Sequence, residues 1–238
     1  MRTIHLGIIP DGNRRFMKKN KLSSVELVNH WCDNMIVGSL KQTLDSDFKN
    51  IDKLKNVKNL SFYISSIDNV HRNDNSTELG YQLLRRIHAL FKDKSKFLTK
   101  EQCVKLENLK CNIRFNVVGE YHLLPEDIRK IITEFKSYYN TKCNNEEEVV
   151  TITLAIAYDY KNDLTNYGAN TNKNYNRVQP QIDCVFRTGN EFRTSGFFPC
   201  HILYAELVVL EKLWPEIELV DLCKVIDIFN KRNRRFGK

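Results

Sequence analysis

Short runs of β-branched and aromatic residues, separated by longer segments with helical periodicity, limit the folds open to this chain. The runs cover residues 4–9, 57–65, 111–118, 149–157 and 182–187. Between them, apolar residues recur at helical spacing over residues 79–91 and 128–135. Strands that alternate with helices indicate right-handed crossovers and a mainly parallel sheet flanked by helices. The sequence therefore predicts an α/β fold, with a single domain over residues 1–238 as the simplest organisation.

Three polar segments are predicted to be loops or linkers. Residues 41–59 are charged and rich in Asn and Asp, although their apolar residues allow a short helix. Residues 140–148 form a polar connector, and residues 162–181 are crowded with Asn, Thr and Tyr. By contrast, residues 76–108 are expected to be one long helical segment.

The charge balance favours an anionic partner. The chain has 37 Lys and Arg against 29 Asp and Glu, a net charge of +8, which suits nucleic acid, a lipid surface or a phosphorylated small molecule. The seven cysteines show no zinc spacing, so reduced thiols are expected. The first apolar run is too short for a signal peptide, and no run is long enough to span a bilayer. We therefore expect a cytoplasmic protein with, at most, peripheral membrane contact.

The first predicted strand ends in a carboxylate, a glycine and two arginines. Asp11-Gly12-Asn13-Arg14-Arg15 is followed by a helical pattern. Backbone N–H groups at a glycine turn and a helix start bind anions, and arginine adds bidentate phosphate contacts. A carboxylate beside a diphosphate is expected where Mg²⁺ bridges the two. A plain Asp-Gly-Asn turn is the structural alternative.

Polar side chains also follow two other predicted strands. They are Ser66, Asn69 and Arg72 after the second strand, and Arg187, Arg193 and Ser195 after the fifth. Ligands of parallel sheets bind beyond the carboxyl ends of the strands, so these groups are expected to converge. Two arginine-containing cradles and one metal carboxylate suggest an enzyme with two phosphorylated substrates. Solvated surface charge is the alternative for each arginine taken alone.

Several common motifs are absent from the sequence. It has no P-loop, no Gly-x-Gly-x-x-Gly after a strand and no His-Glu-x-x-His. It also lacks the Asp-Asp-x-x-Asp pairs that trans-type prenyl synthases use to hold their metals. A nucleic-acid-binding domain would place basic and aromatic residues on one strand face or recognition helix. Here the basic residues gather at strand ends beside carboxylates, which disfavours nucleic acid as a partner.

Six segments together resemble the cis-prenyltransferases, the undecaprenyl and dehydrodolichyl diphosphate synthases. "HLGIIPDGNRRF" is similar to the family's His-x-x-x-Ile-Met-Asp-Gly-Asn-x-Arg-aromatic opening, and "YISSIDNVHR" to its Tyr-x-Phe-Ser-x-Glu-Asn-x-x-Arg block. "VVGEYHLLP", "AIAYDYKND", "DCVFRTGNEFRTSGFFPCHILYAEL" with "LWPE", and "RNRRFG" follow in the family's order. The resemblance implies a Mg²⁺-dependent transferase with a hydrophobic tunnel. Its substrates would be isopentenyl diphosphate and an allylic diphosphate such as farnesyl diphosphate, joined with Z double bonds.

The resemblance also implies roles for individual residues. Asp11 and Glu206 would hold Mg²⁺, and Asp11, Ser66, Asn69 and His30 would serve catalysis. The substrate-binding residues would be Gly12, Asn13, Arg14, Arg15 and Arg72 for the allylic diphosphate, and Arg187, Arg193 and Ser195 for isopentenyl diphosphate. Arg235 and Gly237 would complete a diphosphate site across a homodimer interface. Glu206 as an exposed carboxylate, Ser66 and Asn69 as a helix cap, and His30 as a packed or surface residue are the structural alternatives.

The chain departs from the family pattern at several positions. Pro10 replaces the usual Met, and no arginine lies between Arg15 and Arg72, where the family has a further allylic-diphosphate arginine. Lys18, Lys19 and Lys21 are candidate substitutes, although a lysine is not a bidentate fork. The lengthened residues 76–108 leave the product length open, whereas the shortened residues 162–181 leave the outer face of the sheet open.

The main alternative is a catalytically inactive member of the same family that acts as a regulatory subunit. The chain keeps Asp11, Arg187, Arg193, Ser195 and Glu206, together with the Arg-x-Gly ending. An inactive copy has no chemical need for all of these residues. An active enzyme is therefore the favoured hypothesis.

Overall fold

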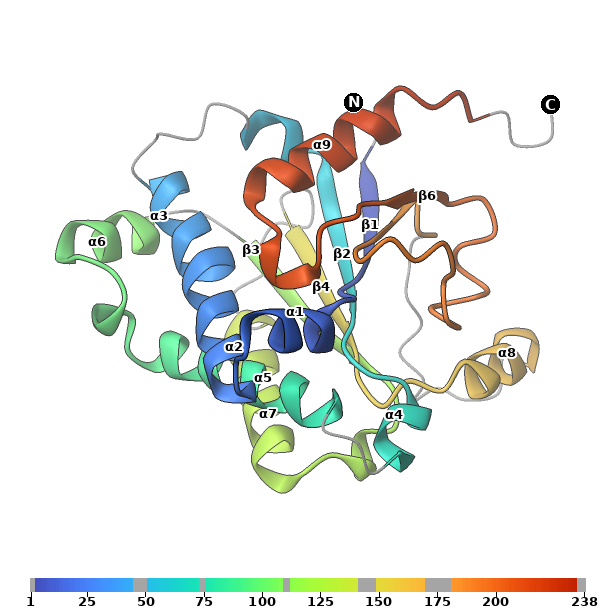
Figure 1. Ribbon diagram of the computed structural model, residues 1–238, viewed down its shortest axis with the longest axis horizontal. Helices are drawn as coiled ribbons and strands as arrows, with labels where there is room; N and C mark the ends of the chain where they lie inside the picture. The colour runs from blue at the N-terminus through green and yellow to red at the C-terminus, as the bar shows by residue number, and fades with distance from the viewer. Residues whose placement is uncertain are drawn as a thin grey trace.

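A parallel sheet forms the centre of the protein (Figure 1). The structure, a computed structural model, describes residues 3–44, 51–72, 76–108, 112–140, 149–169 and 181–234. Within these residues the sheet has six strands in the order β3-β4-β2-β1-β5-β6, and each neighbouring pair is parallel. The strands are β1 (Ile4–Ile9), β2 (Val57–Tyr63), β3 (Asn112–Val118), β4 (Val149–Ala155), β5 (Cys184–Arg187) and β6 (Glu206–Val209). The predicted α/β fold is confirmed.

Strand β1 lies between β2 and β5, and all six of its residues are buried. Its side chains alternate between the two faces of the sheet. Leu6 and Ile8 pack against helix α9 (Leu219–Asn230), whereas Ile9 packs against Phe197 and Phe198 on the other face. Because both faces are covered, the strand is a continuous apolar run, as buried parallel strands usually are.

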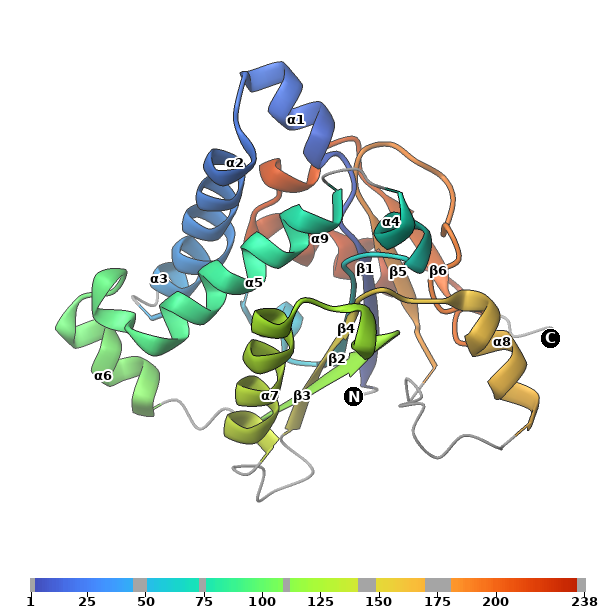
Figure 2. The ribbon, with the colours of Figure 1, turned by 90° about the horizontal axis from the view of Figure 1, so that it is seen from below.

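Helices cover one face of the sheet. Helix α7 (Glu126–Asn140) and helix α5 (Ser76–Lys92) pack over β3 and β4, and α9 packs over β1 and β5. Phe62 of β2 packs against both groups, so all three helices lie on the same face. Helix α2 (Ser24–Trp31) contacts α5, and Figure 2 shows the two helices on that face. The remaining helices are α1 (Asn13–Asn20), α3 (Ser39–Leu44), α4 (Ile67–His71), α6 (Lys100–Asn108) and α8 (Tyr160–Ala169).

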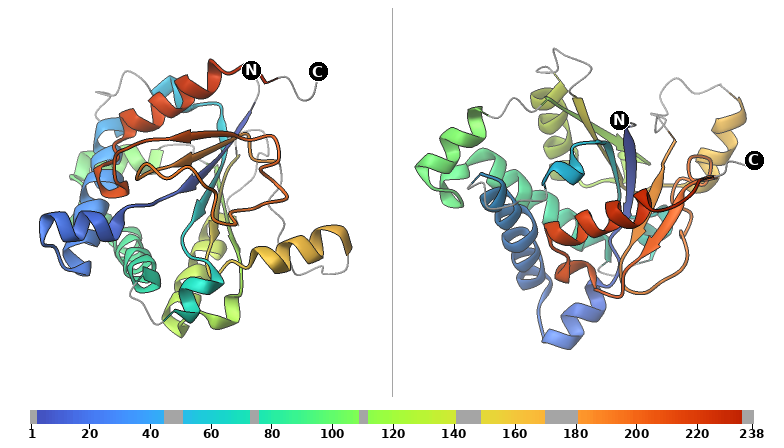
Figure 3. Two further views of the ribbon diagram at one scale, coloured as in Figure 1. Left: turned by 45° about the vertical axis from the view of Figure 1, so that its right-hand side comes forward. Right: turned by 90° about the horizontal axis from the view of Figure 1, so that it is seen from above.

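Helix α2 starts with a capping box and continues into an unusual segment. Ser23 Oγ accepts a hydrogen bond from Glu26 N, and Glu26 Oε2 accepts one from Ser23 N. After Trp31 the chain forms a π-helix over Cys32–Gly38 before α3 begins. Long π-helices are rare, and those found often lie at functional sites. The two views in Figure 3 show α2 and its continuation beside the sheet.

Several predicted boundaries need correction. Residues 162–181 were expected to be a loop, but α8 occupies Tyr160–Ala169, and residues 170–180 lie outside the described ranges. Asp163, near the start of helix α8, is buried and accepts a hydrogen bond of 2.6 Å from Tyr158 Oη. This contact attaches the first turn of the helix to the rest of the protein. The predicted helical segment 76–108 is split into α5 and α6. Strand β6 was not predicted, since four residues at a sheet edge carry little periodic signal.

The described part of the chain contains no helix long and apolar enough to cross a membrane. Its cysteines, Cys32, Cys103, Cys184, Cys200 and Cys223, are free thiols. Of the predicted loops at 41–59 and 140–148, residues 45–50 and 141–148 lie outside the described ranges. The expected short helix within the first is the 3₁₀ turn at Ile51–Leu54.

Candidate active site

A polar cavity of about 680 Å³ lies at the carboxyl ends of β1, β2 and β5. The segments after these three strands converge there, as the sequence predicted from the parallel sheet. Of the residues predicted for the site, those that line the cavity are Asp11, Gly12, Asn13, Arg14, Arg15, Ser66, Asn69, Arg72, Arg187, Arg193 and Ser195.

The backbone of Asp11 is fixed by the neighbouring strand. Asp11 N donates a hydrogen bond of 2.8 Å to Thr188 Oγ1, and Thr188 Oγ1 donates one of 2.7 Å to Asp11 O. The same carbonyl accepts a hydrogen bond from Trp214 N at 2.9 Å. Thr188 is fully buried and directly follows β5. The position of Asp11 therefore depends on β5 as much as on its own strand.

The carboxylate of Asp11 is surrounded by cationic and N–H donors. Arg187 Nη2 donates to Oδ2 at 2.6 Å, and Gly12 N donates to Oδ1 at 2.6 Å. Arg15 Nη2 lies 3.4 Å from Oδ1. Burial raises the pKa of Asp11, but these donors, above all Arg187, outweigh burial and hold the pKa below its ordinary value. Asp11 is therefore ionised at neutral pH.

Gly12 turns the chain from β1 into helix α1. Its φ is 103°, and a Cβ there would lie 2.7 Å from a Leu213 side-chain carbon, so this position requires glycine. Because α1 starts at Asn13, the first backbone N–H groups of the helix have no intrahelical acceptors. They form the rim of the cavity, where a phosphate oxygen can accept their hydrogen bonds.

Arg15 spans two loops at the cavity wall. Its Nη1 donates to Gly189 O at 2.8 Å and lies 3.9 Å from Glu191 Oε1. Gly189 has a φ of 81° and leaves room for this guanidinium. The Arg15 side chain is 47% exposed, so it remains accessible to a ligand.

Arg187 connects Asp11 to the second predicted cradle. Besides its contact with Asp11, its Nη1 donates to Arg193 O and, at 2.9 Å, to Ser195 Oγ. The Arg187 side chain is only 5% exposed. The Arg193 side chain is 60% exposed and pairs with Glu191. A buried inner arginine and an exposed outer arginine are thus available to one diphosphate.

Ser66 and Asn69 form the cap of helix α4. Ser66 N and Ser66 Oγ donate to Asn69 Oδ1 at 3.0 and 2.8 Å, and Asn69 N donates to Ser66 Oγ at 3.2 Å. The helix cap, which was the structural alternative for these two residues, is therefore present. Both residues also line the cavity. Arg72 follows α4 and is exposed at the same cavity.

His30 lies outside the polar cavity, and two other predicted residues cannot be placed. The His30 ring lies against Phe16 in a tilted arrangement, with ring centroids 5.2 Å apart, and is hydrogen-bonded to Asn34. It does not line the polar cavity. Helix α2 directs the His30 side chain toward Phe16 of helix α1. Arg235 and Gly237 lie outside the described residues.

Glu206 is the first residue of β6, so within one chain it lies toward the amino end of the sheet. It pairs with Cys184, whereas Asp11 follows the β1 residue that pairs with Arg187 at the carboxyl end. Its carboxylate lies 3.8 Å from Arg232 Nε. Within one chain the structure therefore does not bring Asp11 and Glu206 together, and a role of Glu206 at the metal stays a prediction.

The lysines suggested as replacements for the missing arginine do not line the polar cavity. Lys19 instead lies 3.3 Å from Glu216 Oε1. Arg14, by contrast, is exposed and lines the cavity, so it is a candidate for the role of the missing arginine.

Sequence reasoning missed three residues of the site. Thr188 anchors Asp11, Glu191 pairs with two arginines, and Tyr63 Oη donates to Ser195 O at 3.1 Å. Tyr63 thereby connects the end of β2 with the loop that carries Ser195. Each is a single polar residue without a spacing signal, so only the fold identifies it.

The donor set fits a magnesium ion held mainly by a substrate. Among the described residues, no three His, Cys, Asp or Glu side chains form a metal-binding cluster. Mg²⁺ is commonly held by one or two carboxylates together with substrate phosphates and water. Asp11 supplies such a carboxylate beside arginines and helix N–H groups that suit phosphate.

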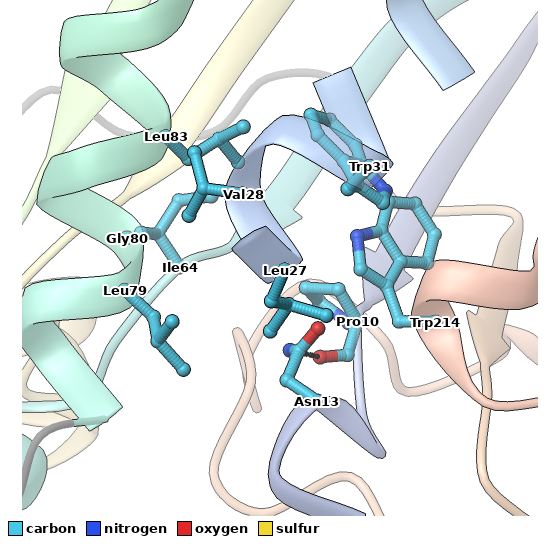
Figure 4. Close-up of a pocket in the computed structure, with 10 residues that line it drawn as sticks. All are labelled: Pro10, Asn13, Leu27, Val28, Trp31, Ile64, Leu79, Gly80, Leu83 and Trp214. Carbon is cyan, nitrogen blue, oxygen red and sulfur yellow. Dashed lines mark hydrogen bonds between the residues drawn. The ribbon is translucent and has the colours of Figure 1, made fainter. Parts of the chain in front are cut away.

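A narrow apolar pocket of about 80 Å³ adjoins the polar cavity (Figure 4). Pro10, Asn13, Ile64 and Leu79 line both spaces, so the two spaces are direct neighbours. The remaining lining residues are Leu27, Val28, Trp31, Gly80, Leu83 and Trp214. The combined site suits a molecule with a charged head and a hydrocarbon tail.

Comparison with known proteins points to one family. The family model described as undecaprenyl diphosphate synthase matches residues 9–237. A tritrans,polycis-undecaprenyl-diphosphate synthase (geranylgeranyl-diphosphate specific) of Pyrobaculum aerophilum is 27% identical, covering 98% of this chain and 95% of its own. The corresponding protein of Thermococcus kodakarensis is 30% identical over 98% of this chain and 86% of its own. An isoprenyl transferase of Chlorobaculum tepidum is 28% identical, with 98% and 85% covered.

Solved structures show the same fold. Lavandulyl diphosphate synthase from Lavandula x intermedia, in complex with dimethylallyl diphosphate, matches with a TM-score of 0.68 at 19% identity, covering 98% of each chain. A Campylobacter jejuni protein described as a probable undecaprenyl diphosphate synthase matches with a TM-score of 0.62 at 22% identity over both whole chains.

Proposed function

Because the chain belongs to the undecaprenyl diphosphate synthase family of prenyltransferases, we propose that it is a Mg²⁺-dependent Z-polyprenyl diphosphate synthase. It would condense isopentenyl diphosphate onto an allylic diphosphate such as farnesyl diphosphate. Residues 1–238 would form a single catalytic domain. The observation that carries the proposal is an arginine-lined cavity around Asp11 that lies directly beside an apolar pocket.

The proposed binding mode follows from the two spaces. The allylic diphosphate would lie against the start of α1, Arg15 and Arg72, with its hydrocarbon chain in the apolar pocket. Arg187, Arg193 and Ser195 would bind the diphosphate of isopentenyl diphosphate. Arg187 would therefore set the distance between the two substrates, since it also holds Asp11.

Condensation breaks the bond between C1 of the allylic chain and its diphosphate oxygen. A new bond joins that carbon to the terminal alkene carbon of isopentenyl diphosphate, and one proton leaves the isopentenyl unit. The cationic donors around the cavity stabilise the diphosphate that departs. Mg²⁺ held by Asp11 would supply further charge neutralisation on the diphosphates. Ser66 and Asn69 would position the isopentenyl unit so that its proton reaches an acceptor, for which the departed diphosphate is suited.

Two further features belong to the proposal. Arg235 and Gly237 would complete a diphosphate site across a homodimer interface. In support, Arg234 Nη1 donates to Asp183 Oδ1 at 2.7 Å, which fixes the chain just before that motif. Glu206 would then act on a metal only through an arrangement that involves the partner subunit. Any membrane contact would be peripheral and depend on the product.

The test is a chain-elongation assay with purified protein. Farnesyl diphosphate, labelled isopentenyl diphosphate and Mg²⁺ should yield Z-polyprenyl diphosphates. EDTA and Asp11→Ala should abolish them, whereas Asp52→Ala, which changes an 83% exposed carboxylate, should not. Absence of products with dimethylallyl, geranyl, farnesyl and geranylgeranyl primers would contradict the proposal and favour an inactive regulatory subunit.

A further inference from the structure

Two helices form the walls of the apolar pocket with the same residue spacing. Helix α2 contributes Leu27, Val28 and Trp31, and helix α5 contributes Leu79, Gly80 and Leu83. Each set follows the pattern i, i+1, i+4, which places three residues on one helical face. Leu79 lines both spaces, whereas Leu83 lines only the apolar pocket, so the helices run from the polar cavity inward. In each helix, residues later in the sequence therefore lie deeper in the apolar pocket.

Trp31 lies at the deep end of this pocket. In Figure 4, Asn13 and Pro10 lie at one end, and Trp31, Val28 and Leu83 lie at the other. The Trp31 indole stacks on Trp214, with ring centroids 5.7 Å apart. Trp31 Nε1 is buried and has no hydrogen-bond partner among the described residues. The indole is therefore held by packing alone.

An ion pair lies between α5 and the π-helix one turn beyond Leu83. Arg86 Nη2, on the turn of α5 after Leu83, lies 3.4 Å from Asp33 Oδ1 in the π-helix that follows α2. The Arg86 guanidinium also lies 4.7 Å from the centre of the Phe97 ring, and its Nε is buried. A hydrocarbon that passed Leu83 would displace solvent from this ion pair without replacing its hydrogen bonds, which is unfavourable.

The volume of the pocket is small for a long isoprenoid. Its 80 Å³ is less than a cavity of roughly 150 Å³ that admits benzene in another protein. A chain that lengthens by repeated condensation would therefore soon press against Trp31. We propose that Trp31 limits the depth of the hydrocarbon site and so sets how many isopentenyl units are added. This inference rests on the proposed function.

Product length in the Trp31 variants tests the inference. Trp31→Ala should shift the longest abundant product upward by at least one isoprene unit with the same primer. Trp31→Leu should shift it in the same direction and serves if the alanine variant fails to fold. Val25→Ala, on the same helix but 59% exposed and outside the pocket, should leave the distribution unchanged. An unchanged or shorter product from a folded Trp31 variant overturns the inference.

Binding provides a readout that does not require turnover. Non-hydrolysable prenyl thiodiphosphates of increasing length are titrated, with displacement of a labelled short analogue as the signal. The ratio of affinities for geranylgeranyl over geranyl thiodiphosphate should rise several-fold in Trp31→Ala. An unchanged ratio overturns the inference whether or not the wild-type protein elongates chains. A wild-type protein that binds these analogues but never extends them contradicts the proposed function alone.

Intrinsic fluorescence gives a third measurement, because the chain has two tryptophans and both line the pocket. A longer thiodiphosphate should change the emission of the wild-type protein more than inorganic diphosphate does. In Trp31→Leu, the remaining signal reports Trp214 alone and should respond more weakly to the same analogue. Equal responses to inorganic diphosphate and to the prenyl analogues would count against contact between the hydrocarbon and Trp31.

Discussion

The guanidinium of Arg187 donates a hydrogen bond of 2.6 Å to the carboxylate of Asp11, although 176 positions separate them in the sequence. The contact arises because β1 and β5 are parallel neighbours, and Ile9 pairs with Arg187 in their register. The same guanidinium contacts Ser195 Oγ at 2.9 Å. One buried arginine therefore links the proposed metal carboxylate to the proposed isopentenyl diphosphate site.

The Asp11–Arg187 pair predicts a specific response to acid. Burial raises the pKa of Asp11, but Arg187 and the other donors reverse this and leave it below the ordinary value of 3.8. A lowered carboxyl pKa contributes stability above the unfolded-state pKa, and this contribution is lost as pH falls through the folded-state pKa. Asp11→Asn should lower the free energy of unfolding by about 1–2 kcal/mol near neutral pH, less than for a fully buried pair.

Urea unfolding across acidic and neutral pH measures this effect. Below about pH 4 the wild-type protein should lose stability more steeply than Asp11→Asn, because the variant has no carboxylate to protonate there. Asp52→Asn serves as the control, since its side chain is 83% exposed. Identical acid dependence in the wild type and Asp11→Asn would show that the pair does not stabilise the fold.

Thr188→Val should disturb the site without adding volume. The variant loses both hydrogen bonds between Thr188 Oγ1 and the Asp11 backbone, so that Asp11 O keeps only its hydrogen bond from Trp214 N and Asp11 N only its hydrogen bond to Ile9 O. We expect a loss of about 1–3 kcal/mol in the free energy of unfolding. Activity should also fall, because Asp11 is no longer held. Thr188→Ser keeps the hydroxyl and should retain most of the stability and most of the activity. A serine variant as impaired as the valine variant would contradict the role of the hydroxyl.

Tyr63 predicts a response to alkali. Burial raises the pKa of Tyr63 to about 12, although a hydrogen bond with Ser66 opposes it. A raised pKa contributes stability below the unfolded-state pKa near 10, and this is lost as pH rises through the folded-state value. Ultraviolet absorbance of the phenolate should therefore show a late-titrating contribution that is smaller in Tyr63→Phe by one tyrosine.

The same variant tests the contact between Tyr63 Oη and Ser195 O. Tyr63→Phe should lose about 0.5–1.5 kcal/mol of stability at neutral pH and raise KM for isopentenyl diphosphate. Tyr121→Phe is a control, because Tyr121 is exposed and does not line the cavity. An unchanged KM in Tyr63→Phe would argue against a role in positioning the Ser195 loop.

Gly189→Ala should act mainly through Arg15. The φ of Gly189 is 81°, and a Cβ there would lie 2.3 Å from Arg15 Nη2. We expect about 1 kcal/mol of backbone strain and a higher KM for the allylic diphosphate, because Arg15 must move. Gly196→Ala carries a similar strain, with a φ of 78°, but contacts Tyr160 instead. Equal effects of both variants on the allylic KM would mean that strain, not Arg15, is responsible.

Much of the fold was accessible from local sequence patterns. The first strand was predicted with the bounds that the structure has, Ile4–Ile9, because a run buried on both faces is continuously apolar. The expectation for residues 162–181 failed because α8 depends on a tertiary contact, the hydrogen bond between Tyr158 and buried Asp163. Strand β6 was missed because it forms by pairing with β5 and not from its own periodicity.

The sequence by itself indicated the parallel α/β architecture and the arrival of Asp11, Arg15 and Arg187 at one edge of the sheet, because the succession of strands along the chain and the side chains that follow each strand are local properties. Only the tertiary structure decided which groups meet. Strand register brings Thr188 to Asp11 and leaves Glu206 toward the opposite edge. Helix packing turns His30 onto Phe16 and places Trp31 at the end of the apolar pocket. Such contacts depend on distances between strands and helices that no short stretch of sequence encodes.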